Sequence, residues 1–307
     1  MRADPTEQSR RDHRSGLAYG VLAYLIWGFF PIYLKAVGTT PVLEVLAHRV
    51  TWAFLFLLPA CFLGGRFGSV RAALASRKAM AALVGSTLLI ALNWGVYIFS
   101  VLSGRIQESS LGYYMNPLVN VLIGVMFLGE RLETPVRLAS ALAALGVISM
   151  AVSLGGLPWI SVTLALSFAL YGLLRKLAPV GAFAGLLIET LLLLPLAAGF
   201  LISLAAKDRG VFLRSAGGLD VLLVLSGPLT AIPLLCFAAA ARRLPLSALG
   251  FLQYLSPTIQ FLLAVLVYDE PFDAARLGAF MMIWTAVAMV AIHTARRGRA
   301  EPVVDAG

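Results

Sequence analysis

The sequence predicts an all-helical membrane protein with ten transmembrane helices, arranged as two inverted repeats of five helices each. Three observations lead to this fold class: the composition, ten apolar runs of spanning length, and an internal repeat. Of the 307 residues, 60% are hydrophobic and 13% are charged, and the mean hydropathy is +0.89. Since a soluble domain has about 45–50% apolar and about 25% charged residues, these values exclude an ordinary soluble protein and a disordered chain.

Ten apolar runs have the length of about 17–25 residues that a helix needs to cross the hydrocarbon core of a bilayer. Each run is predicted to be a helix, because an open strand would leave its backbone polar groups unpaired in lipid. The runs lie between a polar N-terminal tail (1–16) and a C-terminal tail (296–307), and no cleavable signal peptide is expected. They cover residues 17–37, 43–63, 79–102, 109–129, 134–154, 157–174, 181–204, 221–241, 244–268 and 277–295.

The distribution of Lys and Arg predicts the orientation of the chain in the membrane. An even number of spans places both termini on one side, and 17 of the 24 Lys and Arg residues fall on that side. Six fall on the other side, and Arg49 lies within a span. By the positive-inside rule both termini are expected to be cytoplasmic. The same rule explains the net charge of +9 without a nucleic-acid partner.

An internal repeat relates the two halves of the chain. Residues 109–113 (SSLGY) resemble residues 247–251 (SALGF), each segment is followed by a proline, and an acidic residue comes thirteen positions after that proline. The offset of about 140 residues corresponds to five spans, so the halves (17–154 and 157–295) are expected to have opposite orientations. Inverted repeats with a site at their interface are typical of transporters. A duplication in a non-transporting scaffold is the alternative.

Several motifs, in the same order and spacing, resemble those of RarD-type permeases in the EamA branch of the drug/metabolite transporter superfamily. The most specific is SLGYYMNPLVN at 110–120, followed by GER at 129–131; others are HRVTW at 48–52, SFALYG at 167–172 and RLPLSALG at 243–250. The resemblance covers residues 17–295. It implies ten helices, an inverted repeat, a central substrate cavity, and export or exchange of small metabolites across the bacterial inner membrane.

Three ionisable side chains inside the runs are candidates for the site, because charge inside a bilayer is costly and is often functional. Glu189 lies eight residues into its run, about 12 Å deep. It is either a proton or substrate-amine site or a structural group that bridges helices. Arg49 is either an anion-binding or gating group or a side chain that snorkels to the interface. His48 follows Glu44 by one helical turn, so a contact between the two is expected.

Two further sets of residues complete the candidate site. The repeat offset relates Arg49 to Glu189, which predicts a charge couple near the pseudo-symmetry axis. Aromatic and amide side chains far from the span ends are predicted to line a cavity, with helix packing as the alternative: Trp27, Asn93, Trp94, Tyr97, Tyr113, Asn116, Tyr171, Gln253 and Tyr254. Helix breaks that free backbone carbonyls are expected at Pro117 and Pro257. Glu130 and Glu270 are either gate contacts or solvated helix caps.

Missing motifs restrict the energy source and the chemistry. The sequence has no G-x-x-x-x-G-K-[ST] phosphate loop, no H-E-x-x-H and no G-x-S-x-G, and its three histidines and two cysteines are scattered. No cofactor or metal is therefore expected. The predicted function is secondary transport of small metabolites or drug-like solutes by alternating access, with a small-molecule substrate and the lipid bilayer as partners. Proton coupling and oligomeric state stay open. The alternatives are a non-transporting interaction or sensor protein in the membrane and an intramembrane enzyme.

Overall fold

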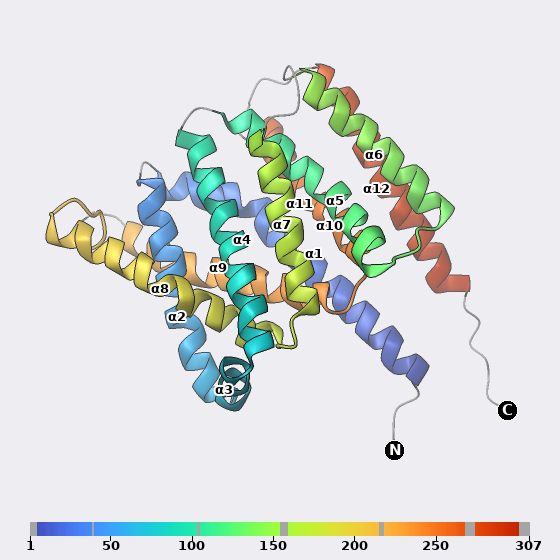
Figure 1. Ribbon diagram of the computed structural model, residues 1–307. Coiled ribbons are helices and arrows are strands. Elements are labelled where there is room, and N and C mark those ends of the chain that lie inside the picture. The colour runs from blue at the N-terminus through green and yellow to red at the C-terminus, as the bar shows by residue number, and fades with distance from the viewer. Residues whose placement is uncertain are drawn as a thin grey trace.

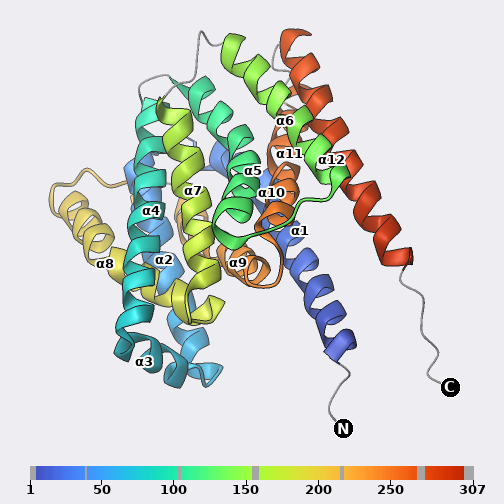
Figure 2. The same cartoon turned by 45° about the vertical axis from the view of Figure 1, so that its right-hand side comes forward.

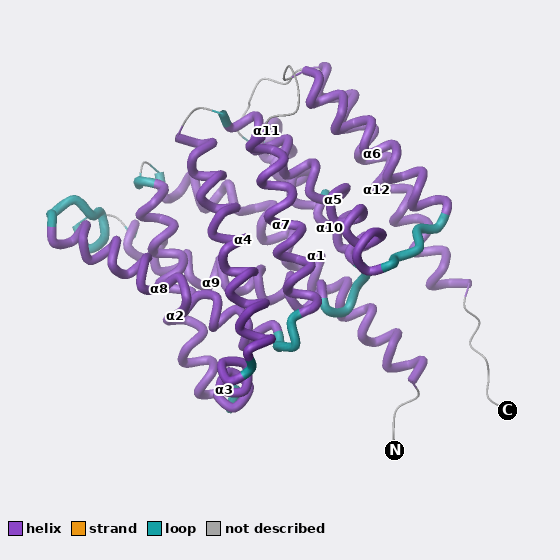
Figure 3. Tube along the Cα trace, in the orientation of Figure 1, coloured by secondary structure: helices purple, strands orange, loops and turns teal. Residues whose placement is uncertain are grey.

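All the secondary structure that is described is helical. A computed structural model describes residues 5–38, 40–102, 105–153, 159–214, 218–267 and 274–300, and no strand occurs within these ranges (Figures 1 and 3). The helices are α1 (Pro5–Val37), α2 (Val42–Leu63), α3 (Phe67–Ala75), α4 (Arg77–Leu102), α5 (Ile106–Leu128), α6 (Thr134–Ser153), α7 (Trp159–Leu177), α8 (Ala182–Ala206), α9 (Leu219–Ala241), α10 (Leu246–Gln253), α11 (Leu255–Leu266) and α12 (Ala274–Ala300).

Eight helices are long and apolar enough to cross a membrane, so the prediction of an all-helical, multi-pass membrane protein is confirmed. These eight are α1, α2, α4, α5, α6, α7, α8 and α9. The predicted ninth span, 244–268, falls on two shorter helices, α10 and α11. The tenth falls on α12, which contains the apolar stretch Leu277–His293. The count of ten therefore stays a prediction.

The two repeated prolines have different effects on their helices. Helix α10 ends at Gln253 and α11 begins at Leu255, so the chain is interrupted just before Pro257. Pro257 then stands in the first turn of α11, where its missing N–H is tolerated. By contrast, α5 runs through Pro117 as a single helix, so the break predicted there is absent.

The chain ends and one loop are more helical than the apolar pattern predicts. The expected N-terminal tail is helical from Pro5, and α12 continues to Ala300, four residues beyond Arg296. Proline suits the first helical position, and exposed charged residues do not oppose a helix that an apolar segment has already nucleated. The short helix α3 also lies where only a loop was expected.

Several of the helix pairings that join the two halves are related by exchange of the halves. The first five predicted spans correspond to α1, α2, α4, α5 and α6, and the second five to α7, α8, α9, the α10–α11 pair and α12. Three helices pack on their own counterparts: α2 on α8, α5 on α10, and α6 on α12. The contact of α1 with α9 matches that of α4 with α7, and the contact of α5 with α7 matches that of α1 with α11. Exchange of the halves preserves these pairings.

The bundle has a clear polarity. Figures 1 and 2 show α6 and α12 side by side at one edge, and they place the start of α1 and the end of α12 at the same end of the bundle. The short helix α3 lies at that end too. A chain that begins and finishes at one end crosses the bundle an even number of times.

The glycines of the repeated motif allow close helix packing. A Cβ atom on Gly112 would lie 3.0 Å from the Cα atom of Ser161 in α7. A Cβ atom on Gly250 would lie 2.7 Å from the carbonyl oxygen of Pro117 in α5. Because both neighbours are backbone atoms, a larger residue would push the helices apart. Helix contacts therefore account for the glycine in both copies of the motif.

Candidate solute-binding site

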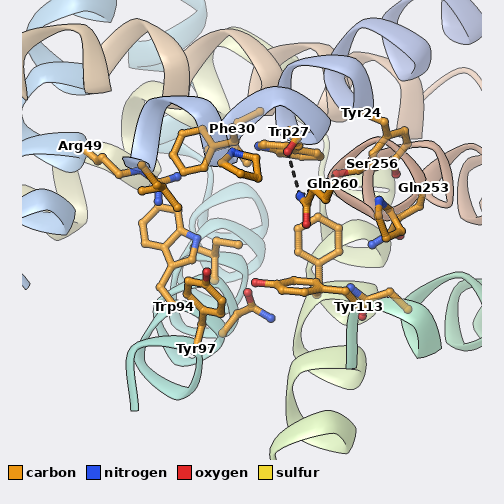
Figure 4. Close-up of a pocket in the computed structure, with 18 residues that line it drawn as sticks. Tyr24, Trp27, Phe30, Arg49, Trp94, Tyr97, Tyr113, Gln253, Ser256 and Gln260 are labelled. Atoms are coloured by element: carbon orange, nitrogen blue, oxygen red, sulfur yellow. Dashed lines mark hydrogen bonds between the residues drawn. The ribbon is translucent and has the colours of Figure 1, made fainter. Parts of the chain in front are cut away.

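A cavity lies where the two halves of the bundle meet. Its volume is about 190 Å³, and it is lined by α1, α2, α4 and α5 from the first half and by α7, α9, α10 and α11 from the second. Figure 4 shows the lining side chains directed toward one another across this space. The residues predicted from the sequence that line it are Trp27, Arg49, Asn93, Trp94, Tyr97, Tyr113, Asn116, Gln253 and Pro257.

Arg49 supplies a positive charge at one end of the cavity. Its Nε donates a hydrogen bond to Oγ1 of Thr230 at 2.9 Å. Its guanidinium carbon lies 4.9 Å from the ring centroid of Phe30 and 5.6 Å from that of Trp94, so an aromatic ring lies on each of two sides (Figure 4). Cation–π contacts of this kind favour the charged group in a partly desolvated position. These contacts hold Arg49 in the cavity wall. They do not fit the alternative prediction, in which the side chain of Arg49 snorkels to the membrane interface.

Aromatic rings form much of the wall between the two ends. The ring centroids of Trp27 and Phe168 are 6.0 Å apart with an edge-on geometry, and those of Tyr97 and Tyr113 are 5.9 Å apart. Sequence reasoning found three of these four residues. It missed Phe168, and also Phe30 and Tyr24, because aromatic residues on a buried helix face look the same in sequence whether they pack or line a cavity.

The amide side chains that line the cavity differ in how many hydrogen bonds they make within the described chain. Both Nδ2 and Oδ1 of Asn116 are buried without a hydrogen-bond partner. The Oε1 atom of Gln253 accepts a bond from Nδ2 of Asn120 at 3.1 Å. Nδ2 of Asn93 donates to the carbonyl oxygen of Leu164 and to Oγ of Ser167, both at 3.0 Å. Asn116 is therefore the amide with donor and acceptor capacity to spare.

Gln260 compensates for a proline in α1. In an uninterrupted helix the carbonyl of Trp27 would accept from the N–H of residue 31, but Pro31 has no N–H. Nε2 of Gln260 on α11 donates to this carbonyl oxygen at 3.0 Å, as the dashed line in Figure 4 shows. Nε2 also lies 3.3 Å from Oγ of Ser256. This bond ties the first half of the chain to the second across the cavity.

Glu189 lies outside this cavity, in a second cluster of polar side chains. Its Oε1 is 3.5 Å from NH1 of Arg175 and also accepts a bond from Oγ of Ser86, while Oε2 accepts a bond from the Tyr171 hydroxyl at 3.4 Å. NH2 of Arg175 donates to the carbonyl oxygen of Ala182 at 3.0 Å. The side chains of Glu189 and Arg175 are only 3% and 1% exposed.

The predicted couple between Arg49 and Glu189 is therefore wrong. Arg49 hydrogen bonds to Thr230 and contacts the aromatic rings of the cavity, whereas Glu189 forms an ion pair with Arg175. From the sequence, Arg175 is one of the 17 cations assigned to the side of both termini, in the connection that follows the apolar run 157–174. Helix α7 continues to Leu177, so Arg175 stays inside the bundle. Arg175 and Glu189 are 14 residues apart and lie on two successive helices. The regular spacing of residues along one helix face therefore does not predict their contact.

Comparisons with known proteins give the family. A model of the EamA-like transporter family matches residues 14–152. Protein RarD of Salmonella typhi is 43% identical over 92% of this chain and 98% of its own length. This chain belongs to the RarD-type branch of the EamA-like transporters. An uncharacterized transporter of Vibrio cholerae is also 43% identical, over 94% of this chain and 98% of its own length. The chloramphenicol-sensitive protein RarD of Pseudomonas aeruginosa is 32% identical over 92% of this chain and 95% of its own length.

A solved structure supports the fold alone. A crystal structure of a protein matches with a TM-score of 0.69 at 19% identity, covering 92% of this chain and 99% of that chain. Together with the apolar helices, the family establishes a multi-pass bacterial membrane transporter of the drug/metabolite type. It is consistent with the expectation that the chain is not an enzyme. Within the described residues no group of histidine, cysteine and carboxylate side chains could hold a metal ion.

Two carboxylates of this RarD-type transporter join the halves at opposite ends of the bundle. Oε1 of Glu130, just after α5, accepts the N–H of Leu246 at 2.6 Å, and Oε2 accepts the N–H and the hydroxyl of Ser247 at 3.0 and 2.7 Å. Glu130 thus caps the N-terminus of α10, where free N–H groups and the helix dipole favour an anion. At the other end, Oε1 of Glu44 accepts the N–H of Val211 at 2.7 Å.

Four predicted residues take positions away from the cavity or beyond the described chain. His48 accepts a bond at Nδ1 from Nε1 of Trp52 at 3.1 Å and does not reach Glu44, so the expected contact between them is absent. The hydroxyl of Tyr171 donates a hydrogen bond to Glu189. Tyr254 packs in the core, and its buried hydroxyl has no hydrogen-bond partner among the described residues. Glu270 lies outside the described residues.

Proposed function

We propose that this RarD-type transporter moves small organic solutes across the bacterial inner membrane by alternating access, without hydrolysing a nucleotide. One observation carries the proposal: the cavity is lined by helices of both halves, so a movement of one half against the other would change its access. Transporters built from repeats bind their substrates at such an interface. The proposed substrate is small and partly aromatic, because rings and amides make up most of the wall.

The proposal includes the arrangement of the chain in the membrane. The halves 17–154 and 157–295 are inverted repeats, and both termini face the cytoplasm. The symmetric helix pairing supports the repeat, since α2, α5 and α6 each pack on the corresponding helix of the other half. The excess of Lys and Arg at the end that holds both termini supports the orientation.

Glu130 and Glu44 are the proposed gates. Each binds backbone N–H groups of the other half, and they lie at opposite ends of the bundle. Alternating access requires that one end open while the other stays closed. In this proposal the Glu130 contact breaks when the cavity opens to the cytoplasm, and the Glu44 contact breaks when it opens outward.

Glu189 is proposed to act in coupling through Arg175 rather than by touching the solute. The pair joins α7 to α8, and Ser86 brings in α4 of the first half. A buried carboxylate can be ionised and paired with a cation, or protonated and neutral. A change between them would alter how α4, α7 and α8 pack together.

Solute flux into proteoliposomes tests the proposal. The probes are radiolabelled phenylalanine, benzoate, phenethylamine and chloramphenicol, measured in counterflow with the unlabelled compound inside. Leu234→Trp should fill the cavity and abolish flux, because Leu234 lines it and is 5% exposed. Leu196→Trp on α8 is the matched control, since Leu196 is 76% exposed and outside the cavity lining. Lack of flux for all four probes, or equal flux in Leu234→Trp, would contradict solute transport through this cavity.

A further inference from the structure

We infer that the solute is an organic anion, with a carboxylate-type oxyanion that binds Arg49 and a planar apolar body that lies along the aromatic wall. The inference rests on the proposed function and names its substrate class. It follows from the charge of the cavity, from the unused hydrogen-bond donors of Arg49, and from the order in which charge, rings and amides follow one another across the site.

The charge of the cavity is positive and uncompensated. None of the described residues that line it carries a carboxylate, and Arg49 is its only cation. No carboxylate of the described chain lies within ion-pair distance of the Arg49 guanidinium. An arginine does not lose its proton in a protein, so this charge persists and needs an anion or water. Anionic solutes are therefore favoured in the cavity, and cationic solutes are repelled.

Most of the donors of Arg49 are unused. Only Nε is engaged, by Thr230. In the described part of the chain no hydrogen bond of NH1 or NH2 of Arg49 is found, which leaves the end of the guanidinium fork free. A planar fork of this kind binds a carboxylate through two parallel hydrogen bonds. Phe30 and Trp94 flank the guanidinium and fix its plane, so little side-chain freedom would be lost on binding.

The layout of the cavity determines the rest of the solute. Figure 4 places Arg49 at one end, Gln253 and Ser256 at the other, and Trp27 and Tyr113 along the sides between them. Rings along a narrow site favour a flat apolar group by stacking. The buried Asn116 amide has neither a donor nor an acceptor partner, and a second polar group of the solute would satisfy it.

Amines fit the cavity less well than acids. Glu189 would be the natural partner of an ammonium group, but it does not line the cavity and is already paired with Arg175. The interpretation of Glu189 as a substrate-amine site therefore has no support in this geometry. Aromatic faces alone attract cations, but Arg49 occupies two of those faces.

Three ligands of equal size and different charge test the inference. The full-length protein, purified in detergent, is titrated calorimetrically with 3-phenylpropanoate, 3-phenylpropanamide and 3-phenylpropylamine. The carboxylate should bind about tenfold or more tightly than the amide, as a charge-assisted hydrogen-bond pair implies, and the amine should bind most weakly. Arg49→Gln should bring the carboxylate to within about threefold of the amide.

Two further variants make the result specific. Arg66→Gln is the matched control, because the guanidinium of Arg66 lies 4.5 Å from the Phe183 ring, outside the cavity lining, and it should leave the carboxylate preference unchanged. Arg49→Lys keeps the charge but lacks the planar fork, so it should show a reduced preference for the carboxylate over the amide. This variant replaces Arg49→Gln in the test if Arg49→Gln does not fold.

The outcomes separate the inference from the proposed function. Equal binding of the three ligands, no carboxylate binding up to 10 mM by folded protein, or a preference that survives Arg49→Gln would each overturn the anion inference. Solute flux blocked by Leu234→Trp would still stand in those cases, and transport through the cavity with it. Failure of that flux would remove the proposed function itself.

Discussion

Glu189 on α8 and Arg175 on α7 form an ion pair that is almost completely shielded, with 3.5 Å between Oε1 and NH1. The Nε atom of Arg175 is buried without a partner, while Ser86 and Tyr171 hydrogen bond to the carboxylate. Such a pair contributes little net stability, because desolvation offsets the attraction between the charges. Removing one partner is costly, since it leaves the other charge buried. This asymmetry leads to the first prediction.

Glu189→Gln should destabilise the protein, by an amount approaching the roughly 3–5 kcal/mol that is typical when one partner of a buried pair is removed. The double substitution Arg175→Met with Glu189→Leu should recover much of this loss, because no buried charge is left. Unfolding of the purified protein in detergent measures both effects. If the double variant is no more stable than Glu189→Gln, the unpaired charge of Arg175 is not the main cause of the lost stability.

The same variants test coupling. If Glu189 carries a proton, Glu189→Gln should abolish pH-driven uptake and leave counterflow largely intact. If Glu189 only pairs with Arg175, both modes should fall together with stability. Unchanged uptake, unchanged counterflow and an unchanged melting temperature would remove Glu189 from the mechanism.

Gly185→Ala tests the pair without changing either charge. A Cβ atom at Gly185 would collide with the Arg175 guanidinium, so the arginine would have to leave its place beside Glu189. We expect a loss of about 1–3 kcal/mol, the usual range for overpacking, and the same shift in the balance of uptake and counterflow as in Glu189→Gln. Gly199→Ala on α8 is the control, because its Cβ atom would meet no other atom. Equal stability of both variants would show that Arg175 can relocate freely.

Glu130→Gln should loosen the end of the bundle where Glu130 caps α10. A neutral amide keeps the shape but accepts less well from the N–H groups of Leu246 and Ser247, so a loss of about 1 kcal/mol is expected. In a Cys61→Ser, Cys236→Ser background, Ser256→Cys places a thiol in the cavity. Its reaction with an impermeant maleimide from the cytoplasmic side should become several-fold faster.

Glu133→Gln is the control for this experiment. Glu133 lies near Glu130 in sequence but contacts His293, with 2.7 Å between Oε2 and Nε2, and takes no part in the α10 cap. If Glu133→Gln accelerates labelling as much as Glu130→Gln does, the effect is not specific to the cap. If neither does, Glu130 is an ordinary helix cap and does not gate the cavity.

Reporter fusions test the orientation. Fusions after Gly65 and Gly181 should read cytoplasmic, and a fusion after Arg209 should read external, because the Lys and Arg residues favour the side of both termini. Gly65, which has a positive φ, and Arg209 both lie in connections between helices, where an insertion disturbs little packing. A cytoplasmic reading after Arg209 would reverse the assignment of α8 and α9.

The sequence predicted the helices well because burial in lipid imposes a simple length rule. It failed at the ends, where polar residues extend α1 and α12, and at Pro117, which α5 passes through as one helix. Whether a proline interrupts a span depends on what can bond to the freed carbonyl, and that partner comes from another helix.

The cavity was predictable in part. Trp27, Arg49, Trp94 and Asn116 were found because polar or large aromatic groups in mid-span need a partner or a space. Charge pairing was not predictable. The repeat offset relates Arg49 to Glu189 in sequence, but which side chains meet depends on how each helix is rotated about its axis, and apolar residues on all faces hide that rotation.

The bond between Gln260 and the Trp27 carbonyl leads to the last prediction. Gln260→Leu removes the donor that replaces the missing N–H of Pro31, and loss of the partner of this partly buried carbonyl should cost about 1–3 kcal/mol. Pro31→Ala restores an N–H within α1, so Gln260→Leu should cost far less in that background. Unfolding of the four proteins in detergent gives a coupling energy, expected to be about 1 kcal/mol or more. Ser256→Ala controls for the second contact of Gln260, at 3.3 Å, and should show no such dependence on Pro31. An equal cost of Gln260→Leu with and without Pro31 would mean that the carbonyl finds another partner, and that the link between α1 and α11 does not depend on this bond.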